Sequence, residues 1–295
     1  MSYIYNLFGA ILEAIYSVIP NFGWAIIIFT VLVRILLLPL MVKQQKSMVN
    51  MQKIQPELTK IQKKYANDKE KLNEETMKLY QQNNVNPMGG CLPLIIQMPI
   101  LIAVYRIIQQ PVTYLLKIDL PAKVFEVLKQ SATDTELNVV AFVTNNFSKA
   151  QSLLEQAKLD FDLSKIQINF DFLGLNLGYS PQNCDGNYLL FIIPVISVIT
   201  SFLTTKLSKA GMPKEAEGTK KEEQPNQMQT MTYIFPLMTG YFCYILPAAM
   251  GIYWIMGNIW QIGQTYVMNK LMSRPAKDGA IEVKPQAISK NKKKK

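Results

Sequence analysis

Residues 22–42 read FGWAIIIFTVLVRILLLPLMV, and this stretch decides which class of protein the chain belongs to. Its one charged residue is Arg34. A helix needs about 20 apolar residues to cross the roughly 30 Å hydrocarbon core of a bilayer. A buried helix of a soluble protein is usually shorter and carries a polar face. The stretch therefore predicts a membrane-spanning helix.

Four more stretches have the same character. Residues 91–111 contain one charged residue, Arg106, and the other three stretches contain none. Pro247 and Gly251 mark the division between the last two stretches. The predicted fold class is an all-α polytopic membrane protein with five transmembrane helices that form one core over residues 22–269. The predicted spans are residues 22–42, 91–111, 188–205, 228–247 and 248–269.

The charges of the connecting segments predict the orientation of the chain. Residues 43–90 carry nine lysines and five acidic residues, and residues 206–227 carry five lysines and four acidic residues. The tail 270–295 carries nine basic and two acidic residues. Residues 112–187 carry six lysines and nine acidic residues. Basic segments stay in the cytoplasm, so the N terminus and the 112–187 loop are predicted outside and the C terminus inside.

Residues 1–21 predict an amphipathic helix that lies on the outer face of the membrane. Five mostly apolar residues recur there at helical spacing, and Pro20 with Asn21 ends the pattern. A sixth, very short span is the alternative. The residues at helical spacing are Leu7, Ile11, Ala14, Ile15 and Val18.

Residues 43–90 predict a cytoplasmic helical hairpin. Two apolar stripes of helical period lie on either side of a turn at Asn67 and Asp68, and Pro56 is tolerable if it starts or kinks the first helix. A solvated loop is the alternative. The stripes are Ile54, Leu58, Ile61 and Tyr65, then Leu72, Thr76, Leu79 and Tyr80.

The predicted outer loop, residues 112–187, has two patterns of its own. Apolar residues at helical spacing predict one amphipathic helix over 136–158. Residues 165–178 alternate apolar and polar side chains and predict a strand or extended chain. Neither pattern indicates a chemical site.

The composition excludes most enzyme classes. The chain has no histidine, which removes Ser-His-Asp and Cys-His catalysis and histidine-ligated zinc. Its cysteines, Cys91, Cys184 and Cys243, form no CxxC pair. No GxxxxGK[ST] run is present, so no nucleotide cofactor is predicted. We therefore expect that the protein is not an enzyme and that it has no cofactor and no metal site.

Arg34 is the most unusual residue of the predicted spans. It lies about 12 Å from the cytoplasmic end of its span, at about 1.5 Å per helical residue. A central arginine costs at least about 2.5–3.5 kcal/mol on insertion scales and usually faces a wet cavity or a partner. No predicted span contains Asp or Glu, so no carboxylate in the spans can pair with it. Snorkelling to the headgroups is the alternative, and it is favoured for Arg106 near the outer end.

Other polar residues of the spans fall at positions where they could share a site with Arg34. Serine and threonine stripes alone more often serve helix packing. Stripes on several spans together with an unpaired arginine predict a hydrophilic pocket within the bilayer, open to the cytoplasm. The candidate residues beside Arg34 are Thr30, Gln97, Ser201, Trp254, Asn258 and Gln261.

Several motifs in this order resemble the YidC/Oxa/Alb family of membrane protein insertases, and their organisation resembles its Gram-positive form. The similar segments cover about residues 1–111 and 188–270. They are VRILLLPL at 33–40, MQKIQPEL at 51–58, NPMGGCLPLIIQMPILIAVYR at 86–106 and LPAAMGIYWIMGNIWQIGQ at 246–264.

The resemblance implies an insertase and chaperone of a bacterial cell membrane, acting alone or with the Sec translocon. It implies a groove closed outside but open to cytoplasm and lipid, which contains Arg34, with Gln97 and Trp254 on groove-facing spans. It also implies that residues 44–88 receive nascent membrane proteins and that the basic tail, which ends NKKKK, contacts ribosomes. The 112–187 loop is long for the Gram-positive form.

Two other functions are compatible with a polytopic membrane protein. A solute transporter or channel usually shows inverted repeats or an intramembrane carboxylate, and the sequence shows neither. A structural assembly factor for respiratory complexes would serve a narrow set of clients. The resemblance favours the insertase.

Overall fold

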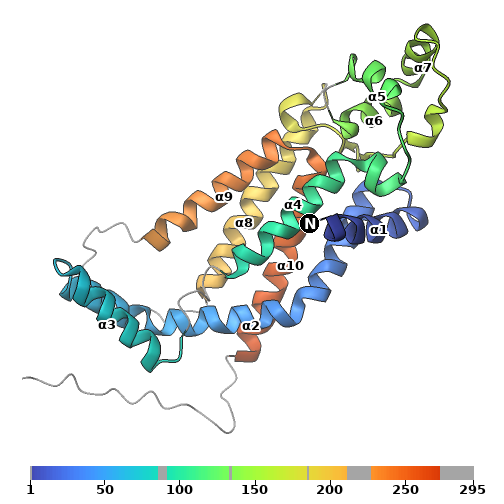
Figure 1. Ribbon diagram of the computed structural model, residues 1–295. Coiled ribbons are helices and arrows are strands. Elements are labelled where there is room, and N and C mark those ends of the chain that lie inside the picture. Colours follow the sequence, from blue (N-terminus) through green and yellow to red (C-terminus); the bar gives the residue numbers. More distant parts are fainter. Residues whose placement is uncertain (1, 86–91, 133–134, 185, 211–226, 273–295) are drawn as a thin grey trace, which may run out of the picture.

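The computed structural model describes residues 2–85, 92–132, 135–184, 186–210 and 227–272, and this part of the chain is mainly helical (Figure 1). The long helices lie at one side of a smaller lobe that is formed by the predicted outer loop. The helices are α1 Ser2–Val18, α2 Phe22–Lys64, α3 Lys69–Gln82, α4 Leu92–Gln109, α5 Ala122–Lys129, α6 Glu136–Asn145, α7 Phe147–Gln156, α8 Ile192–Ala210, α9 Gln227–Ile245 and α10 Ala248–Met272.

Short elements connect these helices. A π-helical turn, η2 Val112–Leu116, follows α4, and three 3-10 turns lie in or after the lobe. Strands β1 Asp171–Phe172 and β2 Leu175–Asn176 pair antiparallel, with Phe172 opposite Leu175. The described chain is therefore not purely helical, and the small hairpin falls within the predicted extended stretch. The 3-10 turns are η3 Leu163–Ile166, η4 Pro181–Asn183 and η5 Tyr188–Phe191.

Helix α2 is one continuous helix of 43 residues. Asn21 caps its N terminus, because the Asn21 side-chain oxygen accepts a hydrogen bond from the Trp24 N–H at 3.2 Å. It runs through the predicted boundary between the first span and the hairpin, and Pro56 lies inside it rather than at a helix start. Each internal proline, Pro39 and Pro56, removes one backbone hydrogen bond, and α2 bends along its course (Figure 1).

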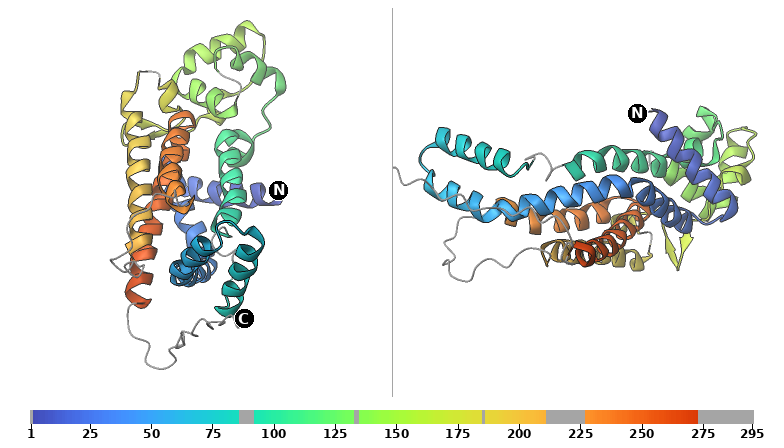
Figure 2. Two further views of the ribbon diagram at one scale, coloured as in Figure 1. Left: turned by 90° about the vertical axis from the view of Figure 1, so that its left-hand side faces the viewer. Right: turned by 90° about the horizontal axis from the view of Figure 1, so that it is seen from below.

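Helix α10 is the centre of the bundle. It contacts α2, α4, α8 and α9, and α8 also packs along α9. Figure 2 shows these helices running side by side with the first part of α2, with the lobe at one end. Helices α4, α8, α9 and α10 occupy the residues predicted for the last four spans, with ends that differ by a few residues.

Two described segments are long and apolar enough to cross a membrane, Phe22–Met51 and Tyr188–Ser208. The apolar helical segments Tyr3–Val18, Ile95–Gln109 and Tyr233–Ile245 are shorter. Many large apolar side chains of the bundle point outward, as expected where lipid replaces water. The number of five spans stays a prediction. Examples of outward apolar residues are Leu36, Val195, Ile199 and Leu237, which are 71%, 56%, 59% and 60% exposed.

Helix α3 folds back along the end of α2. Ile54 and Leu58 of α2 bury their side chains in one cluster with Leu79 of α3 and with Val85. The cluster is small, and exposed charges surround it. A hydrogen bond from Lys78 lowers the pKa of Glu74, but such exposed pairs add little stability. This unit is therefore held mainly by a few apolar contacts.

The helix predicted over residues 136–158 is two helices. Helices α6 and α7 meet at Asn146, which has φ −133° and ψ 47° and lies outside the helical region. The residue before it is also an asparagine, and asparagine has low helix propensity. The change of direction lets both helices bury apolar side chains in one core. Buried examples are Leu137, Val140, Val143, Ala150 and Leu154.

The lobe is packed onto one end of the helix bundle. The Phe22 N–H, at the start of α2, donates to the Asn169 carbonyl at 3.0 Å. The Ala248 N–H, at the start of α10, donates to the Tyr179 carbonyl at 2.8 Å. The first N–H groups of a helix have no partner within it, so lobe carbonyls satisfy them here. The lobe thus fixes the ends of α2 and α10 next to each other.

Candidate functional site

Arg34 lies half-buried on the side of α2 that faces α10. Its guanidinium packs over Gly257, where an added Cβ would lie 2.6 Å from Nη2. Its Nη1 donates to the Met41 sulfur at 3.9 Å, a weak acceptor. Within the described ranges no ion pair includes Arg34. The site is therefore a positive charge at a helix–helix contact with neutral neighbours.

Gln97 and Tyr253 extend this site to a third helix. The Gln97 side-chain amide on α4 donates to the Tyr253 hydroxyl on α10 at 3.0 Å. Tyr253 is 2% exposed and lies within electrostatic range of Arg34. Tyr253 and Gly257 are four residues apart, so they lie on one face of α10. Helices α2, α4 and α10 thus bring Arg34, Gln97 and Tyr253 together.

A second polar group lies between α10 and α8. The Asn258 side-chain amide donates to the Thr200 hydroxyl at 3.0 Å and to the Ser201 hydroxyl at 2.9 Å. Successive helical residues point about 100° apart, which explains why Gly257 faces α2 while Asn258 faces α8. The face of α10 that carries Asn258 thus lies next to the face that contacts Arg34, and the two faces are different.

The remaining predicted residues have local partners. The Thr30 side chain is 1% exposed, and its hydroxyl donates to the Ile26 carbonyl of its own helix at 2.7 Å. The Trp254 ring stacks on Phe242 of α9, with centroids 6.2 Å apart. The Gln261 amide donates to the Thr265 hydroxyl at 3.3 Å. That all these residues line one substrate groove stays a prediction.

Polar contacts continue along α2 and α10 beyond Arg34. The Gln264 side-chain amide donates to the Gln45 side-chain oxygen at 3.4 Å, and the Trp260 N–H donates to Gln264 at 3.3 Å. Gln44 is buried, and its amide nitrogen has no hydrogen-bond partner in the described structure. The sequence interpretation missed these residues because Gln44 and Gln45 follow the apolar stretch and look like loop residues. Because α2 continues through both residues, they lie on a helix that packs against α10, and Gln45 makes a polar contact with it.

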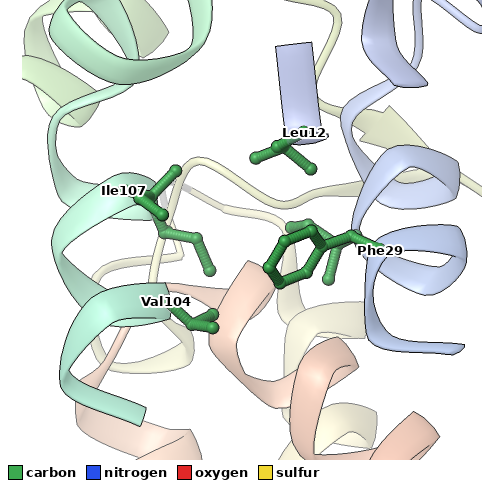
Figure 3. A pocket seen from close by; sticks show the side chains of 6 residues that line it. Leu12, Phe29, Val104 and Ile107 are labelled. Atoms are coloured by element: carbon green, nitrogen blue, oxygen red, sulfur yellow. The ribbon is translucent and has the colours of Figure 1, made fainter. Parts of the chain in front are cut away.

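An apolar cavity of about 10 Å³ lies elsewhere, between α1, α2 and α4 (Figure 3). Its lining includes Leu12, Phe29, Val104 and Ile107, and such a small apolar space stays dry. Among the described residues there is also no group of three or more potential metal ligands. The cavity is therefore too small and too apolar to receive a polar segment.

Comparison with known proteins decides the family. Residues 14–276 match the family model described as "60Kd inner membrane protein". The chain belongs to this family. The resemblance to the YidC/Oxa/Alb insertases is thus confirmed, and the family is one of membrane protein insertases.

Relatives in this family are named as insertases. Membrane protein insertase YidC 1 of Listeria monocytogenes is 31% identical over 278 residues, which cover 93% of this chain and 73% of the relative. YidC of Fusobacterium nucleatum is 32% identical over 92% of this chain and 98% of its own length. YidC of Oceanobacillus iheyensis is 34% identical over 85% of this chain and 76% of its own length. A crystal structure of an active YidC insertase is 25% identical, with a TM-score of 0.49 over 90% of this chain and 46% of that chain.

These relatives confirm the coarse location that the sequence predicts. The relatives are bacterial, and the 60Kd family is described as an inner membrane family. Which side of the membrane each terminus occupies stays a prediction.

Tyr253→Phe is expected to lower the thermal unfolding midpoint of this family member in detergent. The substitution leaves the Gln97 amide without its acceptor in a buried place, which costs about 1–2 kcal/mol. The matched control is Tyr266→Phe on the same helix, because Tyr266 is 63% exposed. Equal midpoints for the two variants would show that the Gln97 contact contributes nothing.

Proposed function

We propose that this protein is a membrane protein insertase and chaperone that moves polar segments of nascent membrane proteins past Arg34. The observation that carries the proposal is the half-buried guanidinium, which lies at the α2–α10 contact and has no carboxylate partner among the described residues. An intramembrane arginine is costly, so a charge of this kind indicates a function. Its chemistry fits a substrate that brings negative or hydrogen-bonding groups.

The mechanism follows from where polar and apolar groups are stable. The outer tail of a nascent chain enters beside Arg34, which offsets part of the cost of removing its polar groups from water. The apolar segment then moves sideways into lipid, and its transfer from water supplies the driving force. The membrane potential adds about 2.3 kcal/mol per charge per 100 mV for charged tails. No nucleotide is needed for these steps.

We propose that the groove runs between α2, α4, α8 and α10 and opens to cytoplasm and lipid. Its support is the set of polar contacts that these helices make with one another. Arg34 and Gln97 both lie near Tyr253, and Asn258 donates to Ser201. In this proposal Thr30, Trp254 and Gln261 are further lining residues. The buried amide of Gln44 offers a free donor toward the cytoplasmic end.

The proposal includes the orientation and the partners. The N terminus and the lobe are outside, and the unit formed by the end of α2 and α3 is cytoplasmic and receives substrate. The support is the lysine-rich composition of residues 43–90 and 206–227. The protein acts alone or beside the Sec translocon.

The experiment that tests this function uses the full chain reconstituted into lipid vesicles. A nascent single-span protein with an acidic outer tail is synthesised in their presence, and the tail fragment protected from protease is measured. We expect protection well above that of vesicles without the protein. Protection no higher than in protein-free vesicles would contradict the proposal.

Removal of residues 275–295 is expected to weaken binding to ribosomes. These residues lie outside the described structure, and their sequence ends NKKKK. Contacts of lysines with RNA phosphates release counterions, so binding should fall steeply with salt. Cosedimentation at low salt measures the effect. As the matched control, Lys292–Lys295 are exchanged for glutamine, which removes their charge and keeps the length of the tail. Unchanged cosedimentation of the truncated chain would show that the tail takes no part in ribosome binding.

A further inference from the structure

The turn of the β1–β2 hairpin exposes a leucine side chain. Leu173 and Gly174 have φ of 55° and 78°, the positive values of a type I′ turn. Asparagine or glycine is the usual first residue of such a turn, and leucine is uncommon there. The Leu173 side chain is 80% exposed, and a Cβ added at Gly174 would meet no atom within 4 Å. Turn geometry therefore does not explain this leucine.

The hairpin is tied to the outer ends of two helices. The Asn21 side-chain amide, at the cap of α2, donates to the Asp171 carbonyl at 2.7 Å. The Asn187 amide, just before η5 and α8, donates to the Gly174 carbonyl at 3.1 Å. The segments that begin here, Phe22–Met51 and Tyr188–Ser208, are the two in the described chain that are long and apolar enough to cross a membrane. The tip therefore lies at the level where both segments enter the bilayer.

The residues around the tip have the character of a membrane interface. Trp24 packs edge-on against Phe172, with centroids 5.4 Å apart, and is itself 48% exposed. Tyr188 and Leu189 are 74% and 63% exposed. Tryptophan and tyrosine are enriched at the headgroup level, where one end of the ring is apolar and the other is wet. This surface continues into the outward apolar side chains of α8, which include Ile192, Val195 and Ile199.

We propose that the β1–β2 hairpin is a lipid anchor of the outer lobe, in which Leu173 inserts into the outer leaflet beside Trp24 and Tyr188. The occupant is phospholipid at the boundary of headgroups and acyl chains. The anchor holds the lobe at a fixed depth, so that its carbonyls stay on the first N–H groups of α2 and α10. The inference requires that α2 and α8 span the membrane, and it does not depend on the insertase function.

Photocrosslinking to lipid tests this anchor in the full chain. A benzophenone amino acid replaces Leu173 in one variant and Lys158 in another, and both are placed in vesicles of phosphatidylethanolamine and phosphatidylglycerol. Lys158 is a matched control because it is exposed, has φ 55° and follows α7, a helix of the lobe that lies away from the bundle (Figure 1). After irradiation, mass spectrometry measures phospholipid adducts.

We expect about tenfold more phospholipid adduct at Leu173 than at Lys158, because a leucine-sized side chain gains at least that factor on leaving water. Equal yields at the two positions would overturn the proposal. Adducts at Leu173 with a second copy of the chain, or with another protein in place of lipid, would overturn it as well.

A second variant separates the anchor from the fold of the turn. Asparagine accepts positive φ, so Leu173→Asn keeps the hairpin. We expect amide exchange of residues 171–176 in vesicles to rise about tenfold when the apolar anchor is lost. Exchange rates equal to those of the unmodified chain would count against the anchor.

Discussion

Arg34→Ala is expected to abolish insertion of substrates with acidic outer tails, while Arg34→Lys keeps most of it. The alanine variant removes the positive charge that Arg34 places over Gly257 at the α2–α10 contact. A charge pair at an effective dielectric constant of about 20 and a distance of about 4 Å is worth about 4 kcal/mol, which corresponds to a rate loss of more than about a hundredfold. Lysine keeps the charge but loses the planar fork of the guanidinium, so a partial loss is expected. The protease-protected fragment of a reconstituted reaction measures the effect.

Two controls make this result specific. Arg106→Ala removes the other arginine of the apolar helices, whose side chain is exposed on α4, and is expected to leave insertion unchanged. A substrate with a neutral tail should depend much less on Arg34. Normal insertion of acidic-tailed substrates by Arg34→Ala would show that the charge has no part in the process.

Gly257→Ala is expected to reduce insertion toward the level of Arg34→Ala without unfolding the protein. A Cβ at Gly257 would lie 2.6 Å from the Arg34 Nη2, so the guanidinium must shift from its place over α10. The end of an arginine side chain is flexible and can move, and alanine in a helix interior is a better helix former than glycine by about 0.8–1 kcal/mol. Stability should therefore hold while insertion of acidic-tailed substrates falls by about tenfold or more.

Gly263 on the same helix supplies the matched control. A Cβ at Gly263 would meet no atom within 4 Å, so Gly263→Ala changes helix propensity without a contact. We expect it to insert substrates at the normal rate. In the Arg34→Ala background, Gly257→Ala should add no further loss, because both changes act on the same group. A folded Gly257→Ala protein with normal insertion would show that α10 does not position Arg34.

The apolar pattern of the sequence was enough to predict helices at the bundle positions. It was not enough to predict which helix faces which. Asn258 and Gly257 are adjacent in sequence, yet one contacts α8 and the other contacts Arg34 on α2. A periodic stripe gives the side of a helix but not its neighbour, so the predicted residues were placed in one group. Tyr253 was missed because its hydroxyl has a partner, Gln97, that is 156 positions away in sequence.

The lobe formed by residues of the predicted outer loop was the least predictable part for the same reason. Its links to the bundle join residues far apart in the chain, such as Asn169 with Phe22 and Tyr179 with Ala248. Local patterns could indicate its extended stretch but not the break between α6 and α7, which depends on how both helices fill one core. The exposed Leu173 has meaning only once the hairpin is seen at the ends of α2 and α8.

The most direct test of the central claim is to locate a stalled nascent chain relative to Arg34. A photoreactive residue replaces Gln97 or Trp254 in the bundle, or Ile199 on the outward face of α8 as the control, since Ile199 is 59% exposed. We expect the acidic tail of the stalled chain to crosslink to positions 97 and 254 more than to 199, and Arg34→Ala to remove this preference. Crosslinks of equal yield at all three positions, or a preference unchanged by Arg34→Ala, would show that Arg34 does not hold the tail in the bundle.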